Sequence, residues 1–177
     1  MSFIDLNIFK GELHYPFPKN NDSCSETDVL DWFIKQYEGK ILRQLLGQLY
    51  YEMKSATIVD GDKWTLLLKG GEYTVGENTY TWNGLEYLIA CFIYFYMTRN
   101  NEIQITTNGG KIVHYEMADN VSLKTKGITN WNNATRLIKS SRCRKRSTVQ
   151  ETLLHFLENN DFENYCVNFY EGGLILW

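Results

Sequence analysis

Residues 83–97 read NGLEYLIACFIYFYM, and this stretch decides the fold. From Leu85 onward it is apolar almost all round, with Glu86 as its one charged residue. Asn83 can cap the start of a helix, and Glu86 stands where a capping box needs a carboxylate. A helix without a polar face lies at the centre of a core, or is shared between a core and an interface. The run is shorter than the roughly 20 residues of a membrane span, and its length and capping favour a buried helix over a buried strand.

A long amphipathic helix is predicted upstream, over residues 26–55. Ser25 and Asp28 have the spacing of a capping box at its start. Apolar side chains then recur every three or four residues, which places one stripe against a core. The stripe comprises Leu30, Phe33, Ile34, Tyr37, Ile41, Leu45, Leu46, Leu49 and Met53. Polar residues such as Glu38 are expected to lie off this stripe.

Two small elements are predicted between these helices. Asp60-Gly61-Asp62-Lys63 is a turn that can cap a short helix over residues 64–69, and Gly70-Gly71 stops it. Residues 72–82 then alternate around Gly76-Glu77-Asn78, with Tyr and Trp side chains on both arms. This pattern is typical of a β-hairpin.

The C-terminal half gives weaker signals. Residues 103–113 carry a turn at Asn108-Gly109-Gly110 and are interpreted as a second hairpin or an extended loop. Thr129 or Asn130 is predicted to cap a third helix, and residues 148–159 again show helical spacing. Whether residues 130–159 form one helix or two stays open. The end of the chain is interpreted as a short strand or an extended tail.

The fold class that these elements predict is mainly α: a small helical bundle with one or two short β-hairpins and extended N- and C-terminal arms. The expected division is an N-terminal arm (1–24), a helical domain (25–164) and a C-terminal tail or short strand (165–177). Apolar residues in the two arms must dock on this chain or on a neighbour. We predict partner contacts for Phe3, Ile4, Phe9, Leu174, Leu176 and Trp177.

Charge is distributed unevenly along the chain. Residues 120–150 hold eight of the 18 basic residues and none of the 21 acidic ones, which leaves a net charge of −11 on the remainder. We predict electrostatic contacts with a partner or with DNA for Lys124, Lys126, Arg136, Lys139, Arg142, Arg144, Lys145 and Arg146. Nucleic-acid phosphates, an acidic protein surface and plain solvation are three open interpretations of this segment. The overall acidity argues against a free DNA-binding protein.

Residue patterns that carry catalysis are missing from the sequence. His14, His114 and His155 lie far apart, the four cysteines form no CxxC pair, and no glycine-rich phosphate loop is present. Cys91 is interpreted as a small buried hydrophobe, and Cys143, with its basic neighbours, as the most reactive thiol. We therefore predict no enzymatic activity, no metal and no cofactor. The cysteine usage and the lack of a visible signal peptide indicate assembly in the cytoplasm.

Several motifs occur in a characteristic order. Leu45-Leu46-Gly47-Gln48-Leu49-Tyr50 ends the long helix, and Trp64-x-x-Leu67-Leu68-x-Gly70-Gly71-x-Tyr73 follows it. Trp82-x-Gly84-Leu85 then leads into the aromatic run of residues 92–96, before the turn of residues 106–110 and a late basic helix. Over residues 26–160 this arrangement resembles the head–tail connector (adaptor) proteins of tailed bacteriophages, particularly those of phages that infect Bacteroides-type hosts.

The resemblance implies a structural virion protein without catalytic residues. It implies a ring of copies, usually twelvefold, that lies beneath the portal protein, surrounds the DNA channel and joins the capsid to a downstream neck or tail protein. It therefore implies localisation in the virion neck and non-specific contact with passing DNA. The alternative function is a nucleic-acid-binding regulator that uses the basic segment 124–146.

Overall fold

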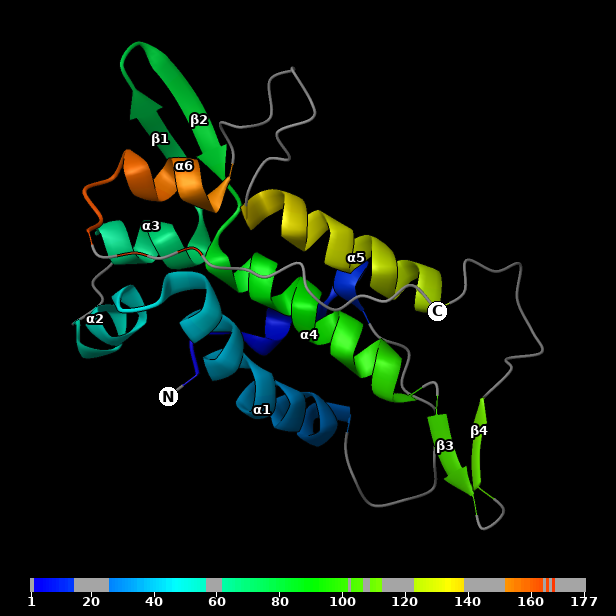
Figure 1. Ribbon diagram of the computed structural model, residues 1–177. Coiled ribbons are helices and arrows are strands. Elements are labelled where there is room, and N and C mark those ends of the chain that lie inside the picture. Colours follow the sequence, from blue (N-terminus) through cyan, green and yellow to red (C-terminus); the bar gives the residue numbers. More distant parts are fainter. Residues whose placement is uncertain are drawn as a thin grey trace.

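The computed structural model describes most of the chain and shows a helical body with two short hairpins (Figure 1). The residues described are 2–14, 26–56, 62–101, 103–106, 109–112, 123–138, 152–163, 165 and 167. The α-helices are α1 (Glu26–Leu46), α2 (Leu49–Ser55), α3 (Lys63–Lys69), α4 (Leu85–Asn101), α5 (Leu123–Ile138) and α6 (Leu153–Glu158). Two 3₁₀ helices, η1 (Leu6–Phe9) and η2 (Gly11–Leu13), precede them. The strands are β1 (Gly71–Val75), β2 (Asn78–Trp82), β3 (Ile103–Thr106) and β4 (Gly109–Ile112). The mainly α prediction is confirmed.

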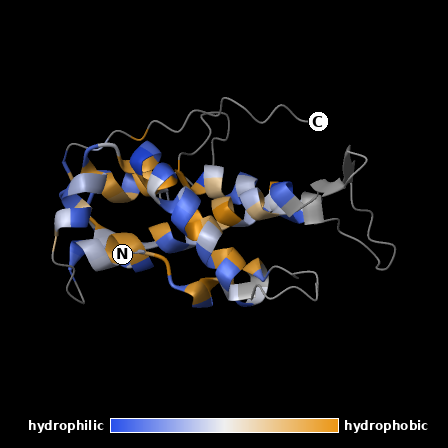
Figure 2. Ribbon diagram, turned by 90° about the horizontal axis from the view of Figure 1, so that it is seen from below, coloured by the Kyte–Doolittle hydropathy of each residue, from blue (hydrophilic) through white to orange (hydrophobic). Residues whose placement is uncertain are grey.

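Helix α4 is the centre of the body, as its apolar sequence predicts. Residues 88–94 are completely buried. Helices α1 and α5 pack on two sides of α4, and α3, η1 and η2 also contact it (Figure 1). The surrounding helices are amphipathic, and Figure 2 shows hydrophobic and hydrophilic stretches alternating along them. The apolar faces converge on α4 and form one core.

The start of α4 differs from the prediction. The carbonyl of Gly84 accepts the N–H of Leu88, so Gly84 rather than Asn83 occupies the capping position. Gly84 has a φ of 88° and is buried against the backbone of Lys69 and Gly70. Only a residue without a Cβ fits this contact, because an added Cβ would lie 2.6 Å from the carbonyl oxygen of Leu68.

The single helix expected over residues 26–55 is broken into α1 and α2. Gly47 adopts a left-handed conformation with a φ of 56°, and its N–H donates to the carbonyl of Arg43. This is a common way for a helix to end. The apolar stripe nevertheless continues across the break, since Leu46, Leu49 and Met53 are all buried.

The elements between α2 and α4 agree with the prediction. Asp62 caps α3 by accepting the N–H of Thr65 at 2.8 Å, and Gly70 ends the helix with a φ of 84°. Strands β1 and β2 pair antiparallel, with Tyr73 opposite Tyr80. The indole N–H of Trp82 donates to the carbonyl of Leu67 at 2.9 Å, which ties the hairpin to α3.

Helix α5 begins at Leu123, several residues before the predicted caps Thr129 and Asn130. Gly127 lies inside the helix and allows a close approach to α4, because a Cβ there would meet Thr98 at 3.1 Å. Asn130, one of the two predicted caps, is 2% exposed within the helix. Helix α6 has its own extended N-cap, Thr152, so α5 and α6 are separate helices.

Strands β3 and β4 form a second antiparallel hairpin, from the pair Ile103–Ile112 to the pair Thr106–Gly109. Residues 103–106 and 109–112 therefore form a hairpin rather than an extended loop. The hairpin follows the end of α4 and lies away from β1–β2 (Figure 1). Among the described helices, none is both long and apolar enough to span a membrane.

Candidate functional site

The N-terminal residues dock on the chain itself. Ile4 and Phe9 are 7% and 6% exposed and belong to the core, and Phe3 packs against that core. Of the two predicted docking sites, this chain or a neighbour, Ile4 and Phe9 take the first, so their predicted partner contacts are corrected. Residues 2–14 pack on the helical body. The predicted partner residues Leu174, Leu176 and Trp177 lie outside the described residues.

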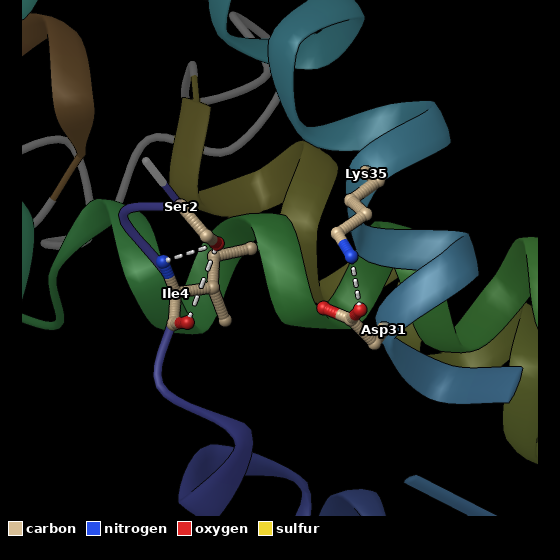
Figure 3. A network of polar contacts seen from close by, with 4 residues as sticks. All are labelled: Ser2, Ile4, Asp31 and Lys35. Atoms are coloured by element: carbon tan, nitrogen blue, oxygen red, sulfur yellow. Dashed lines mark hydrogen bonds and ion pairs between the residues drawn. The ribbon is translucent and has the colours of Figure 1, made fainter. Parts of the chain in front are cut away.

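A buried carboxylate holds this N-terminal segment in place. The Oε1 atom of Glu38 accepts the N–H groups of Phe3 and Ile4 at 2.7 and 3.1 Å and the hydroxyl of Ser2 at 3.1 Å. Figure 3 shows the hydroxyl of Ser2 folded back on the backbone of Ile4, with the Lys35–Asp31 ion pair of α1 also in view. Glu38 was expected off the apolar stripe of α1. It is buried because the N-terminal segment, more than 30 residues away in sequence, covers it.

Burial raises the pKa of the Glu38 carboxyl above its ordinary value of 4.5, and the hydrogen bonds from Phe3, Ser2 and Ile4 oppose this effect. A carboxyl whose pKa is raised by folding favours the folded state most below its ordinary pKa. That contribution is lost as the pH rises through the raised value. The groups that donate to the Glu38 carboxylate, from Ser2, Phe3 and Ile4, all belong to the docked N-terminal segment. Glu38 therefore has a structural role, which is to hold this segment in place.

The described part of the basic segment does not form one patch. Lys124 and Lys126 lie in the first turn of α5 and Arg136 in its last turn, which places them about 15 Å apart along the helix. The exposed residues between Lys126 and Arg136 are polar and uncharged: Thr129 and Asn132. Lys126 is half-buried, with its Nζ 5.4 Å from the centre of the Tyr94 ring. Lys139, Arg142, Arg144, Lys145 and Arg146 lie outside the described residues.

A different charged surface, which the sequence analysis missed, runs along α1 and α2. Its exposed side chains are mostly aromatic, basic, amide or hydroxyl, although the acidic Asp28 is also exposed one helical turn before Trp32. We call this surface the α1–α2 face. Its residues are Trp32, Lys35, Gln36, Lys40, Arg43, Gln44, Gln48, Tyr51, Lys54 and Ser55. Trp32 and Tyr51 are 55% and 53% exposed, and they are the large hydrophobic side chains that stand out at the described surface. Between them the only acidic residue is the buried Glu38.

Acidic side chains gather on the elements around α6. Five exposed carboxylates lie on β1–β2, at the end of α6 and in the turn that follows it, and we call this surface the acidic end. Its residues are Glu72, Glu77, Glu158, Asp161 and Glu163. In Figure 1, β1–β2 and α6 lie at the upper left, whereas α1 and α2 lie below α3 and α4.

Reactive side chains are not grouped for catalysis in the described part of the chain. No three His, Cys, Asp or Glu residues converge there on a metal position. Cys91 is buried in the core, as predicted, whereas Cys143 and His114 lie outside the described residues. His155 is half-buried at the edge of the core, where its Nδ1 lies 2.6 Å from the hydroxyl of Tyr73. This contact joins α6 to β1 and has a structural role.

Comparison with known proteins places most of the chain in one family. The model of DUF6712, described as a family of unknown function, matches residues 42–170. The chain belongs to this family. The DUF6712 region starts in the last turns of α1, and it includes α4, both hairpins, α5 and α6. No curated protein and no solved structure matches the chain.

Proposed function

We propose that this protein is a structural subunit of the virion neck of a tailed bacteriophage. In this role, copies of the chain form a ring around the DNA channel, bind the portal protein on one side and hold a downstream neck or tail protein on the other. The protein has no catalytic task in this proposal. In this proposal the protein acts by binding other proteins through its surface, rather than by binding a ligand in a pocket.

The observation that carries the proposal is the β3–β4 hairpin. It projects beyond the end of α4, the helix that it follows in the chain (Figure 1). A two-stranded hairpin is marginally stable in water unless further strands or a packing surface support it. No other described strand pairs with β3 or β4, and an unpaired strand edge offers backbone groups with which another chain can pair. A projecting hairpin is therefore an element suited to reach a neighbouring copy or the portal.

Two further features support the same role. The described surface carries exposed Trp and Tyr side chains, which are enriched at the centres of protein interfaces. The order of sequence motifs over residues 26–160 resembles that of head–tail connector proteins. The nucleic-acid-binding alternative gains less support, because the described basic residues of segment 124–146 are separated along α5.

The test is to purify the full chain with and without the cognate portal protein and to image both samples by electron microscopy. The proposal predicts a ring of density on the tail-facing side of the portal, present only in the mixture or enhanced by it. A chain that associates with neither the portal nor the neck and tail proteins of its phage, at any salt concentration, would overturn the proposal.

A further inference from the structure

We infer that residues 2–14, which we call the N-terminal strap, dock on α1 and α4 and detach from them as one unit, and that the charge on Glu38 sets the balance between the two states. The structure shows the docked state, in which the strap contacts both helices (Figure 1). Both states belong to a single chain, so the strap does not depend on the proposed function.

The strap holds its own shape through local hydrogen bonds. The N–H groups of Ile8, Lys10 and His14 donate to carbonyls three residues earlier, at 3.0–3.1 Å, and these bonds form η1 and η2. The carboxylate of Asp5 caps η1 by accepting the N–H of Asn7 at 2.9 Å. These bonds join residues of the strap to one another, so detachment from the helices does not require any of them to break.

The strap is attached to the body by few side chains. Ile4, Phe9 and Leu13 are 7%, 6% and 2% exposed and belong to the core. At its start, the N–H groups of Phe3 and Ile4 donate to the Oε1 atom of Glu38 at 2.7 and 3.1 Å. A terminal segment with so few anchors opens at a lower cost in free energy than a central helix such as α4.

Docking of the strap takes the Glu38 carboxyl out of water. Burial raises its pKa above the ordinary value of 4.5, and the hydrogen bonds from the strap offset this effect only in part. Detachment returns the carboxyl to water, because the strap is what covers it. The protonated form therefore favours docking. Docking is strongest below the ordinary pKa of Glu38 and weakens as the pH rises through the raised pKa.

Neighbouring charged groups on the strap and on α4 respond to the same change in pH. Burial also raises the pKa of Glu86 on α4; Lys69 of α3 opposes this effect, whereas Asp5 and Glu38 add to it. The pKa of Asp5 is lowered, mainly by the N–H of Asn7, so Asp5 stays ionised. Rising pH therefore adds negative charge to α1 and α4 beside an anionic strap residue, and repulsion between these carboxylates favours detachment.

The nearby cations compensate this charge only in part. The positive amino terminus of the chain favours the ionised form of Glu38, but its effect is smaller than that of burial. On α1, Lys35 pairs with Asp31, and Lys40 lies over the ring of Tyr37. These interactions leave burial as the main influence on Glu38.

The experiment follows amide hydrogen exchange of the full chain by NMR, from about pH 5 to about pH 8, a range that begins near the ordinary pKa of a glutamate. Exchange is expressed as a protection factor relative to an unstructured chain at the same pH, which removes the ordinary effect of pH on exchange. The protection of the Phe3 and Ile4 amides should fall severalfold across this range. The amides of α4 should keep their protection.

Glu38→Gln removes the charge and keeps a side-chain oxygen that can accept the same hydrogen bonds. In this variant the protection of Phe3 and Ile4 should lose most of its dependence on pH. Glu77→Gln is the matched control, because Glu77 is exposed in the turn between β1 and β2, and it should behave like the unchanged chain.

Phe9→Ala keeps Glu38 and removes one apolar anchor of the strap. The protection of the Phe3 and Ile4 amides should fall by about tenfold or more at every pH, although these amides lie several residues from the substitution. The amides of α4 should be unaffected, because the strap leaves without opening the rest of the core.

Two results would overturn the inference. If the protection of Phe3 and Ile4 does not change with pH, or if Glu38→Gln keeps the full dependence, the charge on Glu38 does not control the strap. If Phe9→Ala lowers the protection of α4 as much as that of Phe3 and Ile4, residues 2–14 open only with the whole core. Neither result bears on the proposed function, which is tested by binding to the portal.

Discussion

The two hairpins of this protein have similar lengths but different surroundings. Hairpin β1–β2 is anchored by Tyr73 and Trp82, which are 5% and 1% exposed and pack against Phe156 of α6. Hairpin β3–β4 follows α4 and projects from its end (Figure 1). The comparison shows that β1–β2 completes the chain's own core, whereas β3–β4 projects from the body, as our proposal requires of an element that contacts another chain.

The largest expected effect concerns the anchor of β1–β2. Trp82→Ala removes a ring that stacks on Phe156 and a hydrogen bond to the carbonyl of Leu67. The free energy of unfolding should fall by about 3–5 kcal/mol, as for other buried aromatic residues. Chemical denaturation measures this value. A fall below about 1 kcal/mol would show that β1–β2 is as loosely attached as β3–β4.

The turn that positions β1–β2 should be nearly as sensitive. At Gly70 the φ is 84°, and an added Cβ would lie 2.3 Å from the carbonyl oxygen of Trp82. Gly70→Ala should therefore cost about 2 kcal/mol or more, from the left-handed backbone and the clash together. Gly76→Ala is the matched control, because Gly76 also has a positive φ but an added Cβ there meets nothing within 4 Å. Equal losses in the two variants would rule out the close approach.

The sequence predicts those elements of the fold whose pattern lies within one short stretch of the chain, and it fails where contacts between distant elements decide the structure. Helix α4 is predictable because its apolar run leaves no polar face, and α3 and β1–β2 are predictable from Asp62, Gly70 and alternating side chains. The start of α5 was placed too late, because Gly127 resembles a helix breaker and Asn130 resembles a cap. Their burial against α4 is a tertiary contact that overrides these local preferences.

The functional surfaces were harder to predict than the fold. Glu38 is an ordinary polar helix residue in the sequence, and its role depends on the distant backbone of Phe3 and Ile4. The α1–α2 face did carry a signal: between Asp31 and Glu52, Glu38 is the only acidic residue among several basic ones. That signal becomes clear only after Glu38 is known to be buried.

A smaller effect is expected at the contact between β1–β2 and α6. Tyr73→Phe removes the hydroxyl that lies 2.6 Å from the Nδ1 of His155 and keeps the ring contacts. The free energy of unfolding should fall by about 0.5–1.5 kcal/mol, the usual net value of one hydrogen bond. Tyr80→Phe, whose ring also contacts His155, is the control. An unchanged stability of the Tyr73 variant would show that this bond does not hold α6 to the hairpin.

The smallest effect on stability is expected at β3–β4. Because Ile103 and Ile112 are paired, a short Gly-Ser loop can replace residues 104–111 without moving the ends of the hairpin. The free energy of unfolding should change by less than about 1 kcal/mol, whereas assembly with the portal should be lost. Thermal melts and sedimentation measure the two quantities. A large loss of stability would show that β3–β4 belongs to the chain's own core.

Hydrogen exchange of the backbone amides in the two hairpins tests the central claim most directly. In the isolated chain, the account predicts slow exchange in β1–β2 and fast exchange in β3–β4, and the β3–β4 amides should become protected when the portal protein is added. If β3–β4 is already as protected as β1–β2 in the isolated chain, and the portal changes neither, the hairpin does not serve another chain.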